Sequence, residues 1–341
     1  MPRKFIQGIF MTAARFDVIG IGNAIVDIIG RCDEAYLATI GASKGSMRLV
    51  GADDVKNIYA TMGSAVEISG GSAANTIAGV ASFGGKAAFI GTIANDEFGK
   101  IFTHDIRSIG VEFDVAPIAN GAPTSRSLIL VTPDGERTMN TFLGISTSLD
   151  ESQLNLDLIR DSAILYLEGY LFDEPQAKQA FRKALQTAKA AGRKVALTLS
   201  DGFCVDRHRA EFLELIRSGI DIIFANESEI KSLYQTESFE LASKNASKDA
   251  KLAVLTRSAK GSVIFSDGNA IEISPEPISE LIDTTGAGDL YAAGFLFGYS
   301  KGYSLEICGR LASLAAAEII SHIGARPEIP LNQLAQQRGA I

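Results

Sequence analysis

The chain has 341 residues, of which 46% are hydrophobic, and its formal net charge is −8. This length is long for one domain and short for three, and it allows a large buried core. The sequence contains no long basic run and no apolar run as long as a membrane span, so we expect neither a nucleic-acid surface nor a membrane anchor. Its three cysteines are far apart and show neither CxxC nor Cys/His metal spacing, which fits a reducing cytoplasm.

The N-terminal segment is basic and then apolar, which gives it a faint likeness to a targeting peptide. Its apolar stretch is short and is interrupted by Gln7 and Gly8, so we do not expect a signal peptide. Residues 1–15 are predicted to form a flexible tail ahead of the first strand.

From Phe16 onward, short apolar runs alternate with amphipathic stretches. Strands are predicted at residues 16–22, 65–69, 87–91, 163–169, 195–200, 221–226 and 252–257. Helices are predicted at residues 72–84, 96–110, 175–191, 206–217 and 227–235. The alternation indicates an α/β fold with a mainly parallel central sheet and helices on both faces. Such sheets bind ligands beyond the carboxyl ends of their strands.

Two segments interrupt this alternation. Residues 24–48 and 112–142 contain short strand patterns and turn signals, but no helix follows in the expected rhythm. We predict that they form a small β-sheet lid over the strand ends. Residues 16–23, 49–111 and 143–335 are then assigned to the α/β core.

The sequence DTTGAGD at residues 283–289 is the strongest functional signal. It leads directly into a helix rich in small residues. Backbone amides of Gly286, Ala287 and Gly288 at this helix start are predicted to form an anion hole for a phosphoryl group. Asp289, in the first helical turn, is placed to accept the proton of an attacking hydroxyl.

Two further elements are predicted to bind the acceptor substrate. In the first, Gly70 and Gly71 precede a helix that carries Ser72 and Asn75, so a ligand can approach bare backbone beside an amide side chain. The second is GIGNAIVDIIG at residues 20–30, where Asn23 and Asp27 follow the first strand.

Two familiar nucleotide motifs are excluded by these sequences. A dinucleotide fingerprint beginning at Gly20 fails because Ile25 replaces its third glycine and no helix pattern follows. A P-loop at Lys86 fails because Val80 replaces the first glycine and Ala87 replaces the Ser/Thr.

From Phe16 to about Pro330, the chain resembles the ribokinase-like (PfkB) carbohydrate kinase family. DTTGAGD matches the second signature of the family, and GGSAAN at residues 70–75, continuing to Lys100, matches the first. The resemblance implies a three-layer α/β/α core with a β-sheet lid, the cofactors ATP and Mg²⁺, and a catalytic base at Asp289. Asn23, Asp27 and the KGSM sequence at residues 44–47 are similar to bacterial adenosine kinase-like members, in which such Asn and Asp residues hold the ribose.

The resemblance also implies a nucleotide site. Asn226 and Glu229 match the NxxE element, which helps organise Mg²⁺ through water and also has the spacing of a helix capping box. Thr256 and Gly261 match a T-x-G-x-x-G nucleotide turn in which Ser258 replaces glycine.

Two more features follow from the same resemblance. A helix at residues 310–327 is expected to close the adenine side of the nucleotide site. Family members often bind a monovalent cation such as K⁺, which here would involve Asp283, Thr285 and Gly324.

The expected reaction is transfer of the ATP γ-phosphoryl group to the 5′-hydroxyl of a ribose-containing small molecule, with adenosine as the leading candidate. A sugar kinase of the ribokinase or fructokinase type and a non-catalytic binding protein are the alternatives. Lid residues Met47, Leu49, Phe142 and Leu143 are available to cover a purine, and the lid arginines Arg126 and Arg137 to reach a phosphate. A monomer and a homodimer formed through the lid are both compatible with the sequence.

Overall fold

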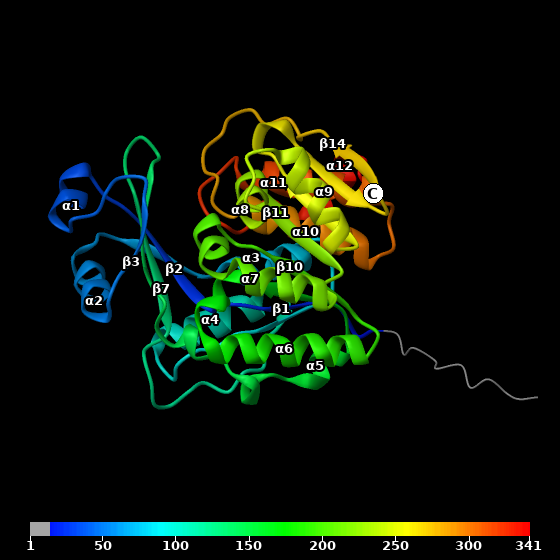
Figure 1. Cartoon of the computed structure of the whole chain (residues 1–341). Coiled ribbons are helices and arrows are strands. Elements are labelled where there is room, and N and C mark those ends of the chain that lie inside the picture. The colour runs from blue at the N-terminus through cyan, green and yellow to red at the C-terminus, as the bar shows by residue number, and fades with distance from the viewer. Residues whose placement is uncertain (1–13) are drawn as a thin grey trace, which may run out of the picture.

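The computed structural model describes residues 14–341 (Figure 1), so most of the predicted tail at residues 1–15 lies outside the described part. In this part the chain forms a nine-stranded sheet and a separate five-stranded sheet. The order in the large sheet is β14-β13-β12-β11-β10-β9-β1-β5-β6. Its strands are β1 (Phe16–Ile21), β5 (Ala87–Ile90), β6 (Val111–Glu112), β9 (Ser162–Glu168), β10 (Lys194–Thr198), β11 (Ile222–Asn226), β12 (Leu252–Thr256), β13 (Ser262–Ser266) and β14 (Asn269–Ile273).

Most neighbouring strands of the large sheet are parallel, and the two antiparallel pairs, β12 with β13 and β13 with β14, lie at one edge. One face is covered by α3 (Ser72–Ser82), α4 (Glu97–Ser108), α10 (Ala287–Ser300), α11 (Leu305–Ile319) and α12 (Leu331–Gln337). The other face is covered by α5 (Leu156–Arg160), α6 (Pro175–Ala190), α7 (Gly202–Gly219), α8 (Glu227–Leu233) and α9 (Phe239–Asp249). The predicted three-layer α/β/α core is therefore confirmed.

The hydrophobic core has two halves, one on each face of the large sheet, and successive side chains of a strand alternate between them. In β1, Val18 packs with the α3 and α10 side, while Ile19 and Ile21 pack with the α6 and α7 side. All three side chains are completely buried. Because strands buried on both faces need apolar residues at every position, continuous apolar runs such as AAFI in β5 mark this sheet in the sequence.

The small sheet has the order β3-β8-β7-β2-β4. Its strands are β2 (Ile25–Arg31), β3 (Met47–Leu49), β4 (Ala65–Gly70), β7 (Ser125–Val131) and β8 (Arg137–Phe142). Two helices, α1 (Glu34–Thr39) and α2 (Ala52–Thr61), lie on the side away from the large sheet (Figure 1). The predicted second, small sheet is therefore present.

Two expectations for the small sheet were wrong. Residues 65–69 were predicted as a strand of the parallel core, but β4 pairs antiparallel with β2 in the small sheet. Its sequence AVEISG alternates apolar and polar residues, which is typical of a strand with one exposed face. Residues 24–48 also contain the helix α1, whose N-cap Asp33 accepts a hydrogen bond from the Tyr36 N–H at 2.8 Å.

Within residues 14–341, the connections also include the 3₁₀ turns η1 (Gly144–Ser148), η2 (Glu151–Gln153), η3 (Gly169–Asp173) and η4 (Ser258–Lys260). Among the described helices, none is both long and apolar enough to cross a membrane.

Candidate active site

The amino end of α10 forms the first part of the site. Gly286 is its N-cap residue and has a φ angle of 77°, a left-handed conformation that favours glycine. A Cβ atom added there would also meet the Ala325 Cβ atom at 3.0 Å. The Ala287 N–H donates to the Thr284 carbonyl at 3.2 Å, whereas the N–H groups of Gly286 and Gly288 have no hydrogen-bond partner in the part of the chain that the structure describes. Two of the three amides of the predicted anion hole are therefore available to a ligand.

Asp289 lies in the first turn of α10, and its carboxylate faces the start of α3. The Ser72 hydroxyl donates to its Oδ1 atom at 2.7 Å, and the Asn75 amide donates to its Oδ2 atom at 3.0 Å. Burial raises the pKa of Asp289, while these hydrogen bonds and the positive charge of Arg326 oppose the shift. A carboxylate with a raised pKa that is held by two donors is suited to accept a proton.

Gly70 and Gly71 connect β4 to α3, and both positions lack space for a side chain. A Cβ atom on Gly70 would collide with the Asp27 carboxylate. Gly71 has a φ angle of 95°, and a Cβ atom there would collide with the Asn23 carbonyl oxygen. The two glycines therefore let this turn lie directly against the Asp27 side chain and the Asn23 backbone.

Glu168, at the carboxyl end of β9, links Asn23 to the start of α3. Its Oε1 atom accepts hydrogen bonds from the Asn23 Nδ2 atom at 2.7 Å and the Asn23 N–H at 3.2 Å. Its Oε2 atom accepts a hydrogen bond from the Ala73 N–H at 2.7 Å. Burial raises the pKa of Glu168 to about 7 against the effect of these bonds, and the charge of Asp289 adds to the rise. Sequence analysis missed Glu168, although a glutamate at the end of an apolar strand is itself a signal.

Asp27 lies on β2 and is buried beside Gly70. Burial raises its pKa to about 6, the charges of Arg326 and Arg137 lower it, and the charge of Asp289 raises it. Asp27 is therefore mainly ionised at neutral pH, and it lies with Asn23 against the diglycine turn that leads to Ser72 and Asn75.

An apolar strip runs beside Asp27 on the same face of the small sheet. The strand register pairs Asp27 with Ser127, and Ser127 with Thr141. Since alternate residues of a strand point to one face, the row two positions further along β2 lies on this face too. That row crosses all five strands through Met47, Met139, Ile129, Ile29 and Val66. Its outer members Met47 and Val66 are 49% and 63% exposed, so these ends of the strip are open to a ligand.

This face is the one turned toward the core. Arg137, two residues before Met139, reaches Asp283 in the core, whereas Arg48 on the other face donates to the carbonyls of Ile40 and Gly41 behind the sheet.

The expectation that Phe142 and Arg126 face a ligand was wrong. These two residues are paired in the register, and they lie on the face opposite to Asp27. The Arg126 guanidinium is stacked 4.6 Å from the ring centre of Phe98 in α4. Leu143 lies beyond the sheet as the N-cap residue of η1. Leu49, in contrast, pairs with Thr141 and shares the face of Asp27.

Asp283, Thr285 and Gly324 were predicted to bind a monovalent cation, and the structure brings them together. The Asp283 carboxylate accepts hydrogen bonds from the N–H groups of Thr285 at 3.0 Å and Gly324 at 3.3 Å. It also forms a buried ion pair with Arg137 at 2.8 Å. Because this guanidinium already balances the charge of Asp283, the carboxylate does not fit a second cation in this arrangement.

Asn226 and Glu229 form the capping box that their spacing predicted. The Asn226 side chain accepts a hydrogen bond from the Glu229 N–H, and Glu229 in turn accepts one from the Asn226 N–H at 3.0 Å. Burial raises the pKa of Glu229 to about 7, and the charges of Asp201 and Asp289 contribute.

The carboxylates of Glu229 and Asp201 are suited to a hydrated magnesium ion, which proteins bind largely through its water molecules. In residues 14–341, no three His, Cys, Asp or Glu side chains are close enough together to hold a metal directly.

Thr256 lies next to Asn226, because β12 pairs with β11 in that register. The following turn contains Ser258, whose φ angle of 51° is left-handed, and Gly261, whose φ angle is 76°. A Cβ atom on Gly261 would collide with the Ile273 carbonyl oxygen. The left-handed conformation explains why glycine suits position 258, the position at which this chain carries serine.

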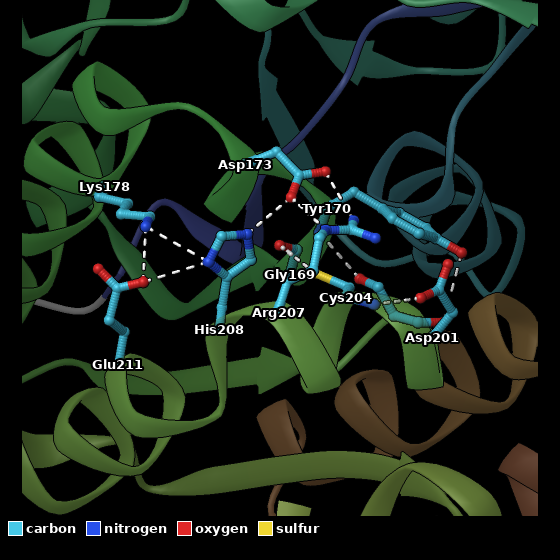
Figure 2. A network of polar contacts seen from close by, with 10 residues as sticks. Gly169, Tyr170, Asp173, Lys178, Asp201, Cys204, Arg207, His208 and Glu211 are labelled. Atoms are coloured by element: carbon cyan, nitrogen blue, oxygen red, sulfur yellow. Dashed lines mark hydrogen bonds and ion pairs between the residues drawn. The ribbon is translucent and has the colours of Figure 1, made fainter. Parts of the chain in front are cut away.

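A polar network fixes η3 and the first turns of α7 beside the site (Figure 2). Arg207 donates two hydrogen bonds to Asp173, at 3.0 and 2.8 Å, and the His208 Nε2 atom lies 2.6 Å from the same carboxylate. Tyr170, just before Asp173 in η3, has its pKa raised by burial and then by the charge of Asp201. Sequence analysis did not identify Tyr170 or Asp201, because no motif marks them.

The helix predicted at residues 310–327 ends earlier, since α11 stops at Ile319. Gly324 has a φ angle of 117° and Pro327 follows, and neither is compatible with a continuing helix. Arg326, which the sequence analysis placed inside this helix, instead lies against Asn75 and Ser69.

Comparisons with known proteins identify the family and the fold. Residues 35–332 match the pfkB family carbohydrate kinase profile. The adenosine kinase of Sinorhizobium meliloti has a solved structure that is 52% identical, with a TM-score of 0.89, covering 95% of this chain and 100% of that chain. A probable sugar kinase from Rhizobium etli CFN 42 is 49% identical, with a TM-score of 0.90 and coverages of 96% and 100%. The adenosine kinase of Saccharomyces cerevisiae is 24% identical over 343 residues, which cover 94% of this chain and 99% of that protein.

Proposed function

The chain belongs to the pfkB family of carbohydrate kinases, and from this premise we propose that it transfers the γ-phosphoryl group of ATP to the 5′-hydroxyl of adenosine, giving AMP. The observation that carries the proposal is the apolar strip across the small sheet, on the same face as Asp27. A nucleoside has a polar ribose joined to an apolar base, and this face places a carboxylate beside an apolar surface in the same way.

In the proposed reaction, Asp27, Asn23 and the Gly70–Gly71 backbone hold the ribose hydroxyls. Asp289 accepts the proton of the 5′-hydroxyl as that oxygen attacks phosphorus. The free amides of Gly286 and Gly288 stabilise negative charge on the transferring group.

The nucleotide is assigned to the neighbouring strand ends. Asn226 and Thr256 lie side by side there, and the turn that ends at Gly261 follows. Mg²⁺, when bound with the nucleotide, neutralises phosphate charge, and Glu229 and Asp201 are the residues assigned to hold its hydration shell.

The buried ion pair between Arg137 and Asp283 supports closure of the small sheet over the acceptor. Arg137 belongs to β8 of the small sheet, whereas Asp283 immediately precedes the glycine turn of α10. Closure excludes water, which otherwise competes with the acceptor hydroxyl for the phosphoryl group. We place the reaction in the reducing cytoplasm, where the three free cysteines persist as thiols.

A sugar kinase remains the second candidate, because a probable sugar kinase from Rhizobium etli CFN 42 is 49% identical to this chain. The two candidates differ in what they require of the apolar strip. A purine covers its half-buried members, such as Ile29 and Met139, whereas a free sugar leaves them partly exposed to water. Burial of a base-sized apolar surface at about 25 cal/mol per Å² contributes several kcal/mol. Adenosine is therefore expected to bind at least about 100-fold more tightly than ribose, which corresponds to about 3 kcal/mol.

The proposal is tested by measuring ATP consumption with adenosine, inosine, guanosine, cytidine, ribose and fructose, and by titration calorimetry of adenosine and ribose. Adenosine should give the highest kcat/KM and the tightest binding. Asp289→Asn should lower turnover by about 10²- to 10⁴-fold. Asp157→Asn, which alters an exposed first-turn carboxylate of α5, is the matched control. Ribose binding as tightly as adenosine would contradict the nucleoside assignment and favour the sugar kinase.

A further inference from the structure

Arg326 donates hydrogen bonds to the chain on both sides of the turn formed by Gly70 and Gly71. Its Nη2 atom donates to the Ser69 carbonyl at 2.6 Å and to the Ser69 hydroxyl at 3.0 Å, just before Gly70. Its Nη1 atom donates to the Ala74 carbonyl at 3.1 Å and to the Asn75 Oδ1 atom at 2.8 Å, just after the turn. One partly buried guanidinium therefore fixes the end of β4 relative to the first turn of α3.

The bond to Asn75 has a consequence for Asp289. An arginine side chain is only a donor, so the atom of Asn75 that faces it must be the amide oxygen. The amide nitrogen of Asn75 then points the other way, where it donates to the Asp289 Oδ2 atom at 3.0 Å. Arg326 thus selects the one orientation of the Asn75 amide in which this residue can hold Asp289.

The same guanidinium connects Asp289 to the small sheet. Ser69 belongs to β4, and its hydroxyl and N–H both donate to the Asp105 carboxylate of α4, at 2.5 and 2.7 Å. A continuous chain of hydrogen bonds therefore runs from Asp105 through Ser69, Arg326 and Asn75 to Asp289. The substrate-covering sheet and the proposed base are connected through a residue that no motif marks.

We propose that Arg326 is a positioning residue, which orients Asp289 through Asn75 and ties that orientation to the placement of β4 in the small sheet. The inference rests on the proposed function, since it assigns Asp289 the role of base. Arg326 touches neither the acceptor nor the nucleotide in this role, and it acts on the reaction only through its neighbours.

The positive charge of Arg326 adds a second, measurable effect. It lowers the pKa of Asp289, which burial raises. The other titratable groups close enough to Asp289 to interact with its charge are Asp27, Tyr166, Glu168, Tyr170 and Glu229. None of these groups carries a positive charge, so Arg326 is the cation that favours the ionised form of Asp289. Its removal should therefore move the acid limb of the kcat–pH profile, the range in which kcat falls as Asp289 is protonated, to higher pH. A purely structural role would lower activity or stability without moving that limb.

The test compares Arg326→Gln, Arg326→Lys and Arg48→Gln in the full chain, with kcat and both KM values measured from pH 5.5 to 9. Arg48 is a matched control, because it also donates to two backbone carbonyls and to an Asn Oδ1 atom, but on the far face of the small sheet. Arg326→Gln should lower kcat at pH 7 by about 10- to 100-fold and shift the acid limb upward by about one unit. Arg326→Lys should keep the limb in place and lose part of kcat, since lysine keeps the charge but not the fork of donors. Arg48→Gln should change neither kcat nor the position of the acid limb.

A double-mutant cycle with Asn75→Ala tests whether Arg326 acts through Asn75. If it does, the double variant should have nearly the kcat of Asn75→Ala alone when both are measured at the plateau above the acid limb, where the direct charge effect on Asp289 no longer contributes. Additive losses would overturn the inference, as would a wild-type acid limb in Arg326→Gln. If Arg326→Gln does not fold, Arg326→Lys provides the test. Because lysine keeps the positive charge, an acid limb that moves upward by about one unit in Arg326→Lys would also overturn the inference.

Asp289→Asn separates the two possible failures. If this variant keeps its turnover, the role of Asp289 is wrong, and the inference about Arg326 is wrong with it. If Asp289→Asn is inactive while Arg326→Gln behaves as wild type, only the inference about Arg326 is wrong.

Discussion

The helices α3 and α10 begin in the same way on opposite sides of the site, yet their amino ends are compensated differently. Each begins at a glycine with a positive φ angle, 95° at Gly71 and 77° at Gly286. At α3, the Glu168 carboxylate accepts a hydrogen bond from the first-turn N–H of Ala73 at 2.7 Å. At α10, the first-turn N–H of Gly288 has no partner within the described residues.

This difference indicates which reactant each helix serves. The positive end of α3 is already balanced by a buried carboxylate, so a second negative charge there is unfavourable. A neutral acceptor with hydroxyl groups is compatible with it. At the end of α10, the N–H groups of Gly286 and Gly288 have no partner among the described residues and favour an anion, such as the phosphoryl group in transfer. Asp289 belongs to α10 but is held by Ser72 and Asn75 of α3, so the proposed base lies where the two reactants meet.

The same substitution at the two helix starts should therefore have different kinetic effects. Gly286→Ala places a Cβ atom 3.0 Å from Ala325 in a left-handed conformation, which displaces the phosphoryl-binding amides. It should lower kcat by about 10- to 100-fold with little change in acceptor KM. Gly71→Ala pushes the backbone against the Asn23 carbonyl oxygen and should mainly raise acceptor KM. Steady-state kinetics with each substrate varied in turn measures both effects.

Thermal unfolding is the control for this pair, because both substitutions strain the backbone. Gly286→Ala costs about 1–2 kcal/mol in the left-handed conformation, and Gly71→Ala adds a clash with the Asn23 carbonyl oxygen. Gly302→Ala, at a φ angle of 75° in open space beyond α10, imposes a strain like that of Gly286→Ala away from the site. It should lower Tm without changing kcat or KM. A rise in acceptor KM in Gly286→Ala equal to that in Gly71→Ala would contradict the division between the two helices.

The elements of the large sheet and the residues of α10 could be predicted from the sequence, because each depends on local pattern. Continuous apolar runs identified strands such as β5 and β9, and the glycines of DTTGAGD identified the helix start. The partners of a strand depend on long-range geometry, however. The residues of β4 were recognised as a strand, but its place in the small sheet was not predicted.

Glu168 and Arg326 could not be assigned from the sequence for the same physical reason. Each acts through contacts far away along the chain: Glu168 binds Asn23 across 145 positions, and Arg326 binds Asn75 across 251 positions. Neither residue lies in a sequence motif whose spacing predicts its hydrogen-bond partner. The monovalent-cation site was predicted without the ion pair from Arg137, which becomes visible only when β8 is placed over Asp283.

Glu168→Gln tests the compensation at α3 and should have the next largest effect. A glutamine oxygen can accept some of the three hydrogen bonds, but its amide cannot accept the bond from Ala73, and the charge is lost. Hydrogen bonds to a charged group contribute about 1.5–3 kcal/mol, so acceptor KM should rise by about 10-fold or more at pH 8. The KM for ATP should change little, because Glu168 contacts only the acceptor side.

The pH dependence of acceptor KM gives the sign of this effect. The pKa of Glu168 is raised to about 7 by burial, so the carboxylate is ionised above that pH and protonated below it. Acceptor KM in the wild type should therefore fall as pH rises from 6.5 to 8, and Glu168→Gln should lose this dependence. The pKa of Asp27, at about 6, affects mainly the lower end of this range, while Glu229, whose pKa is about 7, lies on the nucleotide side. A slope that persists in Glu168→Gln would assign the titration to another group.

Ser258→Gly should have the smallest effect, and it measures the kind of left-handed strain that glycine avoids at Gly286. Ser258 has a φ angle of 51°, and a left-handed conformation costs a residue with a Cβ atom about 1–2 kcal/mol. Glycine removes that cost but adds conformational freedom to the unfolded chain, so the expected net gain in unfolding free energy is about 0.5–1 kcal/mol. Ser247→Gly, inside α9, is the matched control and should destabilise, since glycine is a poorer helix former than serine. Denaturant unfolding of both variants measures the two opposite signs. If Ser258→Gly also leaves the KM for ATP unchanged, the serine hydroxyl is not needed and the nucleotide turn depends on its backbone conformation. The starts of α3 and α10 are expected to bind their ligands through the backbone in the same way.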